Sequence, residues 1–353
     1  MITNYQIYKL TYILLFNFPV NLRDFEGKTK LLTLIMNNFN IQIPQKNNFH
    51  PLISLGILVL FIFAGWLIFQ FIALASVLPF FNFNFDTIII VISDPLHYPE
   101  LIIPFLIVQG ILSLGMFIIA PLLFMRFIDQ SNIRQFVIMR HARSLLIPIL
   151  ITIILVIVFM PLNSVVIEWN ASIKFPEYLS SFEQWAAEKE SMLKNFTILI
   201  TDFSNFPQFL LGVLVIAMIP AAGEELVFRG LVQNKLFQLT KNPHIAIWVA
   251  ALLFGLIHFQ FYGVVPRMLL GVIFGYLYLW SGNLLIPVIA HFINNGFTAV
   301  IIYLSNLNII TFDIESTEAM PWELVIISLI LTLFLIYYLR KYYHTNIQLT
   351  IDN

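Results

Sequence analysis

The residues of this chain that can do chemistry lie in three short segments of its second half. The segment "EELVFR" carries Glu224, Glu225 and Arg229 directly after an apolar run. His258 ends the apolar stretch "AALLFGLIH", and His291 lies within the apolar stretch "LLIPVIAHFINN". Carboxylates and imidazoles are the usual general acids and bases of proteins, so this set is typical of proton transfer or of activating a water molecule.

Helical spacing separates the two glutamates. Glu225 and Arg229 are four residues apart with the acid first, which is the favourable order for an ion pair on one helix face. Glu224 points about 100° away around the same helix. The spacing therefore predicts that Arg229 holds Glu225 in an ion pair and that Glu224 is left free to react.

The two histidines lie inside runs that are otherwise apolar. Phe254 lies one turn before His258, and His291 shares a helix face with Asn295, whereas Asn294 points elsewhere. Taken singly, each is a packing residue or one partner of an interhelical hydrogen bond. Together they predict one polar cavity, because each ionisable group near the bilayer centre costs about 2.5–3.5 kcal/mol and such groups face the bundle interior.

The composition is that of a membrane protein. The chain is 59% hydrophobic and only 10% charged, against roughly 45–50% and 25% for a soluble protein, and its mean hydropathy is +0.88. Apolar segments of about 20 residues recur, which is long enough to cross a bilayer as helices. We therefore expect an all-α polytopic transmembrane bundle of about eight spans, at 52–79, 101–124, 145–165, 207–228, 244–263, 266–280, 284–304 and 322–339.

Two further properties of the composition exclude whole classes of function. The chain has no cysteine, which excludes a thiol nucleophile, disulfides and iron–sulfur ligation. Its net charge of −1 gives no reason to expect a nucleic-acid partner.

The charges of the loops predict the orientation of the chain. Lys and Arg follow the second, fourth and eighth spans, at Arg126, Arg134, Arg140, Arg143, Lys235, Lys241, Arg340 and Lys341, whereas the alternate loops are acidic. Because Lys and Arg mark the cytoplasmic side, both termini are expected in the cytoplasm. The fourth span should continue as a helix to about Thr240, and Arg267 should snorkel to the interface.

Four parts of the chain follow from this reading. They are an N-terminal cytoplasmic segment at 1–50, transmembrane helices at 51–206, a helix core carrying the polar motifs at 207–304, and a last span with a cytoplasmic tail at 305–353. Met36 is a second possible start, so the first 35 residues are expected to be an over-extended gene start. The loop 166–200 spaces its large apolar residues at helical intervals, which predicts an extracytoplasmic amphipathic helix.

The ordered set "EELVFR", "FGLIH" and "HFINN" resembles the three motifs of the CPBP family, EExxxR, FxxxH and HxxxN, over about residues 207–304. This family comprises the type II CAAX prenyl endopeptidases and the bacteriocin-processing enzymes, which are intramembrane proteases. The resemblance implies a membrane-embedded peptidase in which a glutamate activates the attacking water. It implies that Glu224 is the general base, that His258 orients the water, and that His291 and Asn295 donate to the oxyanion. Glu225, Arg229 and Phe254 take supporting positions.

The resemblance leaves the role of a metal open. Family members are often labelled metalloproteases, and a zinc ion would take Glu224, His258 and His291 as ligands. The sequence lacks HExxH, the zinc pattern of soluble metalloproteases. We expect a mechanism without metal or other cofactor.

Two other classes of function remain as alternatives. One is a transporter whose intramembrane Glu and His relay protons, and the other is a non-catalytic membrane chaperone or bacteriocin-immunity factor. The expected partners are membrane lipids and a membrane-associated peptide or protein. The expected location is the bacterial inner (cytoplasmic) membrane.

Overall fold

The computed structural model describes residues 49–93, 98, 101–137, 145–311, 313 and 316–351. Every regular element in these residues is a helix, which confirms the predicted all-α class. The N-terminal segment up to residue 48, with the second start at Met36, lies outside the described residues, and so do Arg140 and Arg143.

The helices follow one another with short connections. In chain order they are α3 (Pro51–Val77), α4 (Phe85–Ser93), α5 (Ile102–Ser113), α6 (Ala120–Phe124), α7 (Arg134–Val137), α8 (Leu146–Ala171), α9 (Ser180–Thr201), α10 (Phe206–Gly212), α11 (Ile219–Glu225), α12 (Asn234–Thr240), α13 (Pro243–Leu256), α14 (Val264–Ser281), α15 (Leu285–Asn306) and α16 (Trp322–Ile351). Shorter helical turns join some of them, namely η2 (Leu78–Phe81), η5 (Leu114–Ile119), η6 (Met125–Asp129), η7 (Glu177–Leu179), η8 (Val213–Met218), η9 (Leu226–Gln233) and η10 (Phe261–Gly263).

Seven helices in the described part of the chain are long and apolar enough to cross a membrane. They cover Pro51–Phe81, Ile102–Asp129, Leu146–Ala171, Phe206–Thr240, Phe261–Ser281, Leu285–Asn306 and Trp322–Thr345. The remaining predicted span, 244–263, corresponds to α13, which is apolar but has only 14 residues. Its predicted end was wrong because the chain leaves the helix after Leu256 and turns at Phe259, which has a positive φ of 53°. The protein is a polytopic helix bundle with seven helices of spanning length and one short apolar helix.

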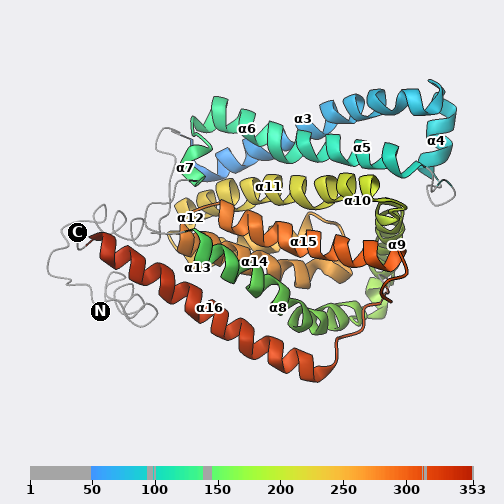
Figure 1. The fold of residues 1–353 in the computed structure, drawn as a ribbon. Coiled ribbons are helices and arrows are strands. Elements are labelled where there is room, and N and C mark those ends of the chain that lie inside the picture. The colour runs from blue at the N-terminus through green and yellow to red at the C-terminus, as the bar shows by residue number, and fades with distance from the viewer. Residues whose placement is uncertain are drawn as a thin grey trace. The chain divides into compact units, whose positions relative to one another are not determined.

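Figure 1 shows how the described helices lie side by side. Helices α3, α5 and α6 pack together, and next to them runs the long helix made of α10, η8, α11, η9 and α12. On its other side lie α13, α14 and α15, followed by α8 and then α16. The helices that carry the three polar motifs are thus enclosed between the N-terminal helices and the α8–α16 pair.

The long helix with the two glutamates runs without a break from Phe206 to Thr240, which confirms the predicted continuation of the fourth span as a helix to about Thr240. Asn205 caps its first turn, its side chain accepting a hydrogen bond from the Gln208 backbone N–H at 3.0 Å. Two stretches of it, η8 and η9, are π-helical, and Glu224 and Glu225 lie between them. Such wider turns are rare and occur frequently at functional sites.

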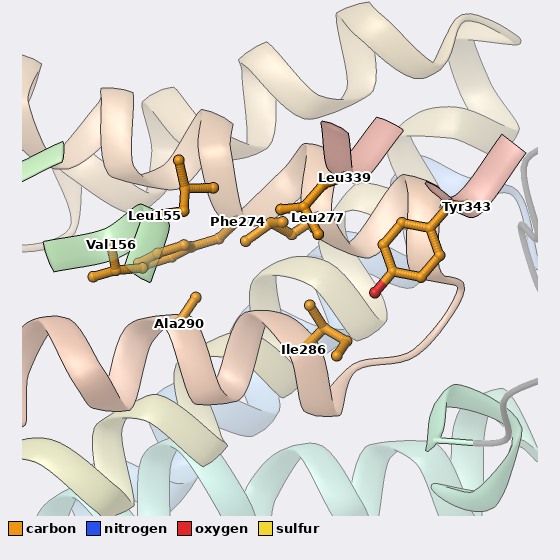
Figure 2. Close-up of a cluster of buried hydrophobic side chains, with 8 residues drawn as sticks. All are labelled: Leu155, Val156, Phe274, Leu277, Ile286, Ala290, Leu339 and Tyr343. Atoms are coloured by element: carbon orange, nitrogen blue, oxygen red, sulfur yellow. The ribbon is translucent and has the colours of Figure 1, made fainter. Parts of the chain in front are cut away.

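A cluster of buried apolar side chains supports the motif helices from the side of α8 and α16 (Figure 2). Its members are Leu155, Val156, Phe274, Leu277, Ile286, Ala290, Leu339 and Tyr343, each at most 4% exposed. Residues from four helices interlock here, so α14 and α15 are held at a fixed distance from each other. Close packing of this kind transmits strain and tolerates little change in volume.

The predicted amphipathic helix in the loop 166–200 is present as α9, which has 22 residues. Figure 1 shows it crossing one end of the bundle. Its aromatic side chains pack on the turn that follows α13: the rings of Phe182 and Phe261 are 5.7 Å apart. Helix α9 therefore lies against the segment that carries His258.

Candidate active site

Arg229 is enclosed completely by partners at the centre of the bundle. Its Nη1 donates to Glu225 Oε1 at 2.8 Å, and its Nη2 donates to the Gly271 carbonyl at 2.9 Å. The guanidinium also lies over the rings of Phe254 and Phe274, at 4.7 and 5.4 Å from their centroids. A buried charge is tolerated only when it is paired and hydrogen-bonded, and these four contacts meet that condition.

The same glutamate orients His291. Nδ1 of His291 lies 2.9 Å from Glu225 Oε1, and since a carboxylate only accepts, Nδ1 carries the hydrogen. The imidazole stacks on Phe274 with ring centroids 5.4 Å apart. The other ring nitrogen, Nε2, lies 4.0 Å from Glu224 Oε2. Glu225 thus fixes the ring so that Nε2 faces Glu224.

Glu224 makes fewer hydrogen bonds than Glu225. Its side chain is only 11% exposed, yet Oε2 has no hydrogen-bond partner among the residues that the structure describes. Oε1 of Glu225 accepts hydrogen bonds from Arg229 and His291, whereas Oε2 of Glu224 accepts none. A buried carboxylate oxygen without a donor is a site for a water molecule or a ligand.

His258 lies in the turn after α13 and not inside a helix, contrary to the predicted span. Its Nδ1 donates to the Phe254 carbonyl at 2.8 Å and so satisfies one of the open carbonyls at the end of α13. Since Nδ1 carries the hydrogen, Nε2 of the neutral ring is an acceptor. The Phe254 ring contacts both imidazoles, at 5.3 Å from His258 and 5.7 Å from His291. Both histidines therefore flank one aromatic ring.

The depths of the three motifs agree once the helix lengths are known. Counted from the turn between α12 and α13 at 1.5 Å per residue, Glu224 lies about 24 Å along its helix, and α13 ends at Leu256, just before His258, after about 20 Å. Gly230 packs beside Leu284 at the start of α15. The turn between α12 and α13 lies ten residues after Gly230, so it extends about 15 Å beyond the start of α15. His291, although only about 10 Å from Leu284, lies at the same depth as the other two.

Asn295 lies one turn after His291 on α15 and contacts the site helix. Its Nδ2 donates to the Ile216 carbonyl at 3.2 Å, in the π-helical stretch η8. Asn294 was expected to point elsewhere, but its Nδ2 donates to Asn295 Oδ1 at 3.1 Å. An amide nitrogen has two hydrogens, so Asn295 keeps one donor beyond its bond to Ile216.

Arg267, which was predicted to snorkel to the interface, has its guanidinium bound to another side chain of the protein. It is partly buried, and its Nη2 donates to Gln260 Oε1 at 2.5 Å. Gln260 in turn donates from Nε2 to Glu190 Oε1 on α9 at 3.0 Å. The acidic residue on α9 and the lack of a side chain at Gly263 draw the guanidinium inward, which the one-dimensional hydropathy pattern could not reveal.

Sequence reasoning also missed the contribution of α14. Besides Gly271, Gly275 accepts a hydrogen bond, from Gln233 Nε2 at 3.2 Å. A Cβ at Gly271 would lie 3.1 Å from Ala251, and one at Gly275 would lie 2.8 Å from Ile247. The signal that would have found this face is "GVIFG", with two glycines four residues apart, a spacing typical of close helix approach in membranes.

The described residues do not fit the zinc site that was considered. No group of three or more His, Cys, Asp or Glu side chains within the described ranges lies close enough to hold one metal ion. Glu224, His258 and His291 therefore do not form a three-ligand set in this arrangement. We derive no chemical step through a metal.

These observations define a polytopic helical membrane protein that encloses a glutamate pair, two histidines and an arginine between its helices. Residues 206–297 match the family model described as type II CAAX prenyl endopeptidase Rce1-like. Together with the three motifs in order, this match supports the assignment of this part of the chain to the CPBP family.

Two curated relatives match part of the chain. The uncharacterized protein YpbD of Bacillus subtilis (strain 168) is 31% identical over 85 residues, which is 23% of this chain and 40% of that protein. The membrane-embedded CAAX protease MroQ of Staphylococcus aureus (strain USA300) is 35% identical over 82 residues, or 22% of this chain and 33% of that protein. The aligned part thus spans well under half the length of either relative. No solved structure matches the chain.

Proposed function

We propose that this protein is an intramembrane endopeptidase that hydrolyses a peptide bond of a membrane-associated peptide or protein. The family match over residues 206–297 and the protease among the relatives support this class of activity. The observation that carries the proposal is the unused carboxylate oxygen of Glu224, 4.0 Å from Nε2 of His291 inside an apolar bundle.

In the proposed reaction Glu224 is the general base. It takes a proton from a water molecule whose oxygen attacks the carbonyl carbon of the scissile peptide bond, and it returns that proton to the leaving amine. His258 accepts a hydrogen bond from the water on Nε2, because its Nδ1 is occupied by the Phe254 carbonyl.

The remaining polar groups face the charge that develops on the carbonyl oxygen. Asn295 has one N–H left to donate, and His291 donates from Nε2 when both of its ring nitrogens carry a proton. Donors of this kind are worth about 2.7–4 kcal/mol each in a soluble protease. Glu225 and Arg229 keep His291 in place.

The proposal includes the surroundings of the enzyme. It acts without a metal, it is embedded in a bacterial cytoplasmic membrane with both termini in the cytoplasm, and its substrate reaches it from the lipid phase. Its outer helices support a lipid-facing location, since large apolar side chains such as Leu60, Phe71 and Ile330 are at least 60% exposed.

Comparison of the peptides in cells that carry the wild-type protein or the Glu224→Gln variant tests the function. Peptides whose amounts differ between the two strains identify the substrate and the bond that is cleaved. A non-catalytic chaperone, immunity factor or transporter would leave no cleavage product that depends on Glu224, and that result would overturn the proposal.

A further inference from the structure

The surroundings of Arg267 contain a second set of polar atoms that the proposed reaction does not use. Nη2 of Arg267 is bound by Gln260, but Nη1 is buried and has no hydrogen-bond partner among the residues described. Oε2 of Glu190, whose other oxygen binds Gln260, is equally buried and equally without a partner in that part of the chain. A guanidinium N–H that is shielded from water and lacks an acceptor is costly unless something supplies one.

The position of this guanidinium is built into the backbone. A Cβ at Gly263 would lie 1.9 Å from Arg267 Nη1 and 2.9 Å from its Cζ. The guanidinium thus occupies the space that any other residue at 263 would fill. Gly263 has a φ of −120°, which an alanine also adopts, so the backbone of the turn does not require a glycine. The missing side chain instead leaves room for the guanidinium of Arg267.

Arg267 lies near the proposed base without contacting it. Arg267 lies one helical turn before Gly271 on α14, whose carbonyl binds Arg229, and its partner Gln260 lies two residues after His258. The ion pairs formed by Glu224 in the described structure do not include Arg267, which places the two groups more than 4.0 Å apart. Arg267 therefore does not pair with the base, and its guanidinium can bind another part of a peptide held in the site.

We propose that Arg267 is a substrate-recognition residue whose guanidinium binds a carboxylate of the peptide substrate beside Glu224, an inference that rests on the proposed function. Arg presents a planar fork of donors that matches a carboxylate, and a charge-assisted hydrogen bond in an apolar site is strong. Gln260 holds one edge of the fork and leaves Nη1 for the ligand. The carboxylate belongs to the free C-terminus of the substrate or to an acidic side chain near the cleaved bond.

Two pairs of synthetic peptide libraries separate these sources. The first pair consists of randomised apolar nonapeptides with a free C-terminal carboxylate or with a C-terminal amide. In the second pair both members have a C-terminal amide, and one carries Asp and the other Asn at one internal position. The purified full-length protein is incubated with each library in lipid vesicles, and the products are quantified by mass spectrometry.

The wild-type protein should cleave the charged member of one pair about ten- to a hundredfold faster than the neutral member, as expected for one charge-assisted hydrogen bond. Arg267→Gln and Gly263→Ala should bring this ratio towards one, the second by displacing the guanidinium without changing its charge. Two matched controls should keep the wild-type ratio. Arg134→Gln removes an exposed arginine, and Gly56→Ala adds a Cβ that meets nothing within 4 Å.

A wild-type ratio near one in both pairs, or a ratio that survives both Arg267→Gln and Gly263→Ala, overturns the proposal. Equal slowing of both members by Gly263→Ala also overturns it, because that pattern indicates a structural role. A wild-type protein that cleaves no library contradicts the proposed function instead. In that event binding of the same libraries to the Glu224→Gln variant still decides whether Arg267 recognises a carboxylate.

Discussion

Glu224 Oε2 lies 4.0 Å from His291 Nε2, and it has no hydrogen-bond partner within the described structure. The opposite ring nitrogen of His291 is bound to the neighbouring glutamate, Glu225, at 2.9 Å. One histidine therefore lies between Glu225, whose Oε1 binds both Arg229 and His291, and Glu224, whose Oε2 accepts no hydrogen bond in the described structure. Substitutions at these two positions should have different consequences.

Glu224→Gln should abolish turnover and leave the fold intact. A general base contributes about 10²- to 10⁴-fold to the rate, and an amide cannot take the proton. The variant should unfold at the wild-type temperature or above it, because the buried oxygen has no partner to lose. Rates of peptide cleavage and thermal unfolding in detergent measure the two effects, with the exposed Glu323→Gln as control. Full activity in Glu224→Gln would refute the assignment of the base.

Arg229→Met should destabilise the protein by about 3–5 kcal/mol. The methionine removes the arginine partner of Glu225, the hydrogen bond to Gly271 and the contacts of the guanidinium with the Phe254 and Phe274 rings. The buried carboxylate of Glu225 is left with His291 as its hydrogen-bond partner. Denaturant unfolding followed by tryptophan fluorescence gives the free energy. The exposed Arg134→Gln should stay within about 0.5 kcal/mol of wild type. Equal stabilities for the two variants would show that the buried ion pair is not needed for folding.

Gly271→Ala should cost about 1–3 kcal/mol through overpacking between α13 and α14. The added Cβ would lie 3.1 Å from the Ala251 Cα and 3.3 Å from Arg229 Nη2, so α14 has to move away from both. Gly230→Ala is the matched control in the site helix, since its nearest neighbour would be 3.4 Å away. There the better helix propensity of alanine should leave stability unchanged or higher. A comparison of unfolding temperatures tests this, and a harmless Gly271→Ala would contradict the close packing.

Chelation should leave peptide cleavage unchanged if the proposed reaction proceeds without metal. The experiment combines elemental analysis of the purified protein with cleavage assays before and after dialysis against a chelator. We expect less zinc than protein on a molar basis and no loss of rate. Stoichiometric zinc whose removal stops cleavage, and whose return restores it, would show instead that Glu224, His258 and His291 rearrange into a metal site.

The sequence by itself determined the features that depend on local helical geometry. The long apolar runs predicted the helix bundle and the extension of the fourth span to Thr240. The four-residue spacing of Glu225 and Arg229 suffices for their contact, because one turn of helix brings such side chains together.

The tertiary structure decided every feature that depends on how one helix is placed against another. His258 was assigned to a helix because its surroundings are apolar, but the chain turns there and packs under α9. Arg267 turns inward because Glu190, 77 residues earlier, approaches Gln260. Phe274 and Gly271 join the site because the register of α14 sets them opposite Arg229. Contacts between helices depend on register and rotation, about which hydropathy carries no information.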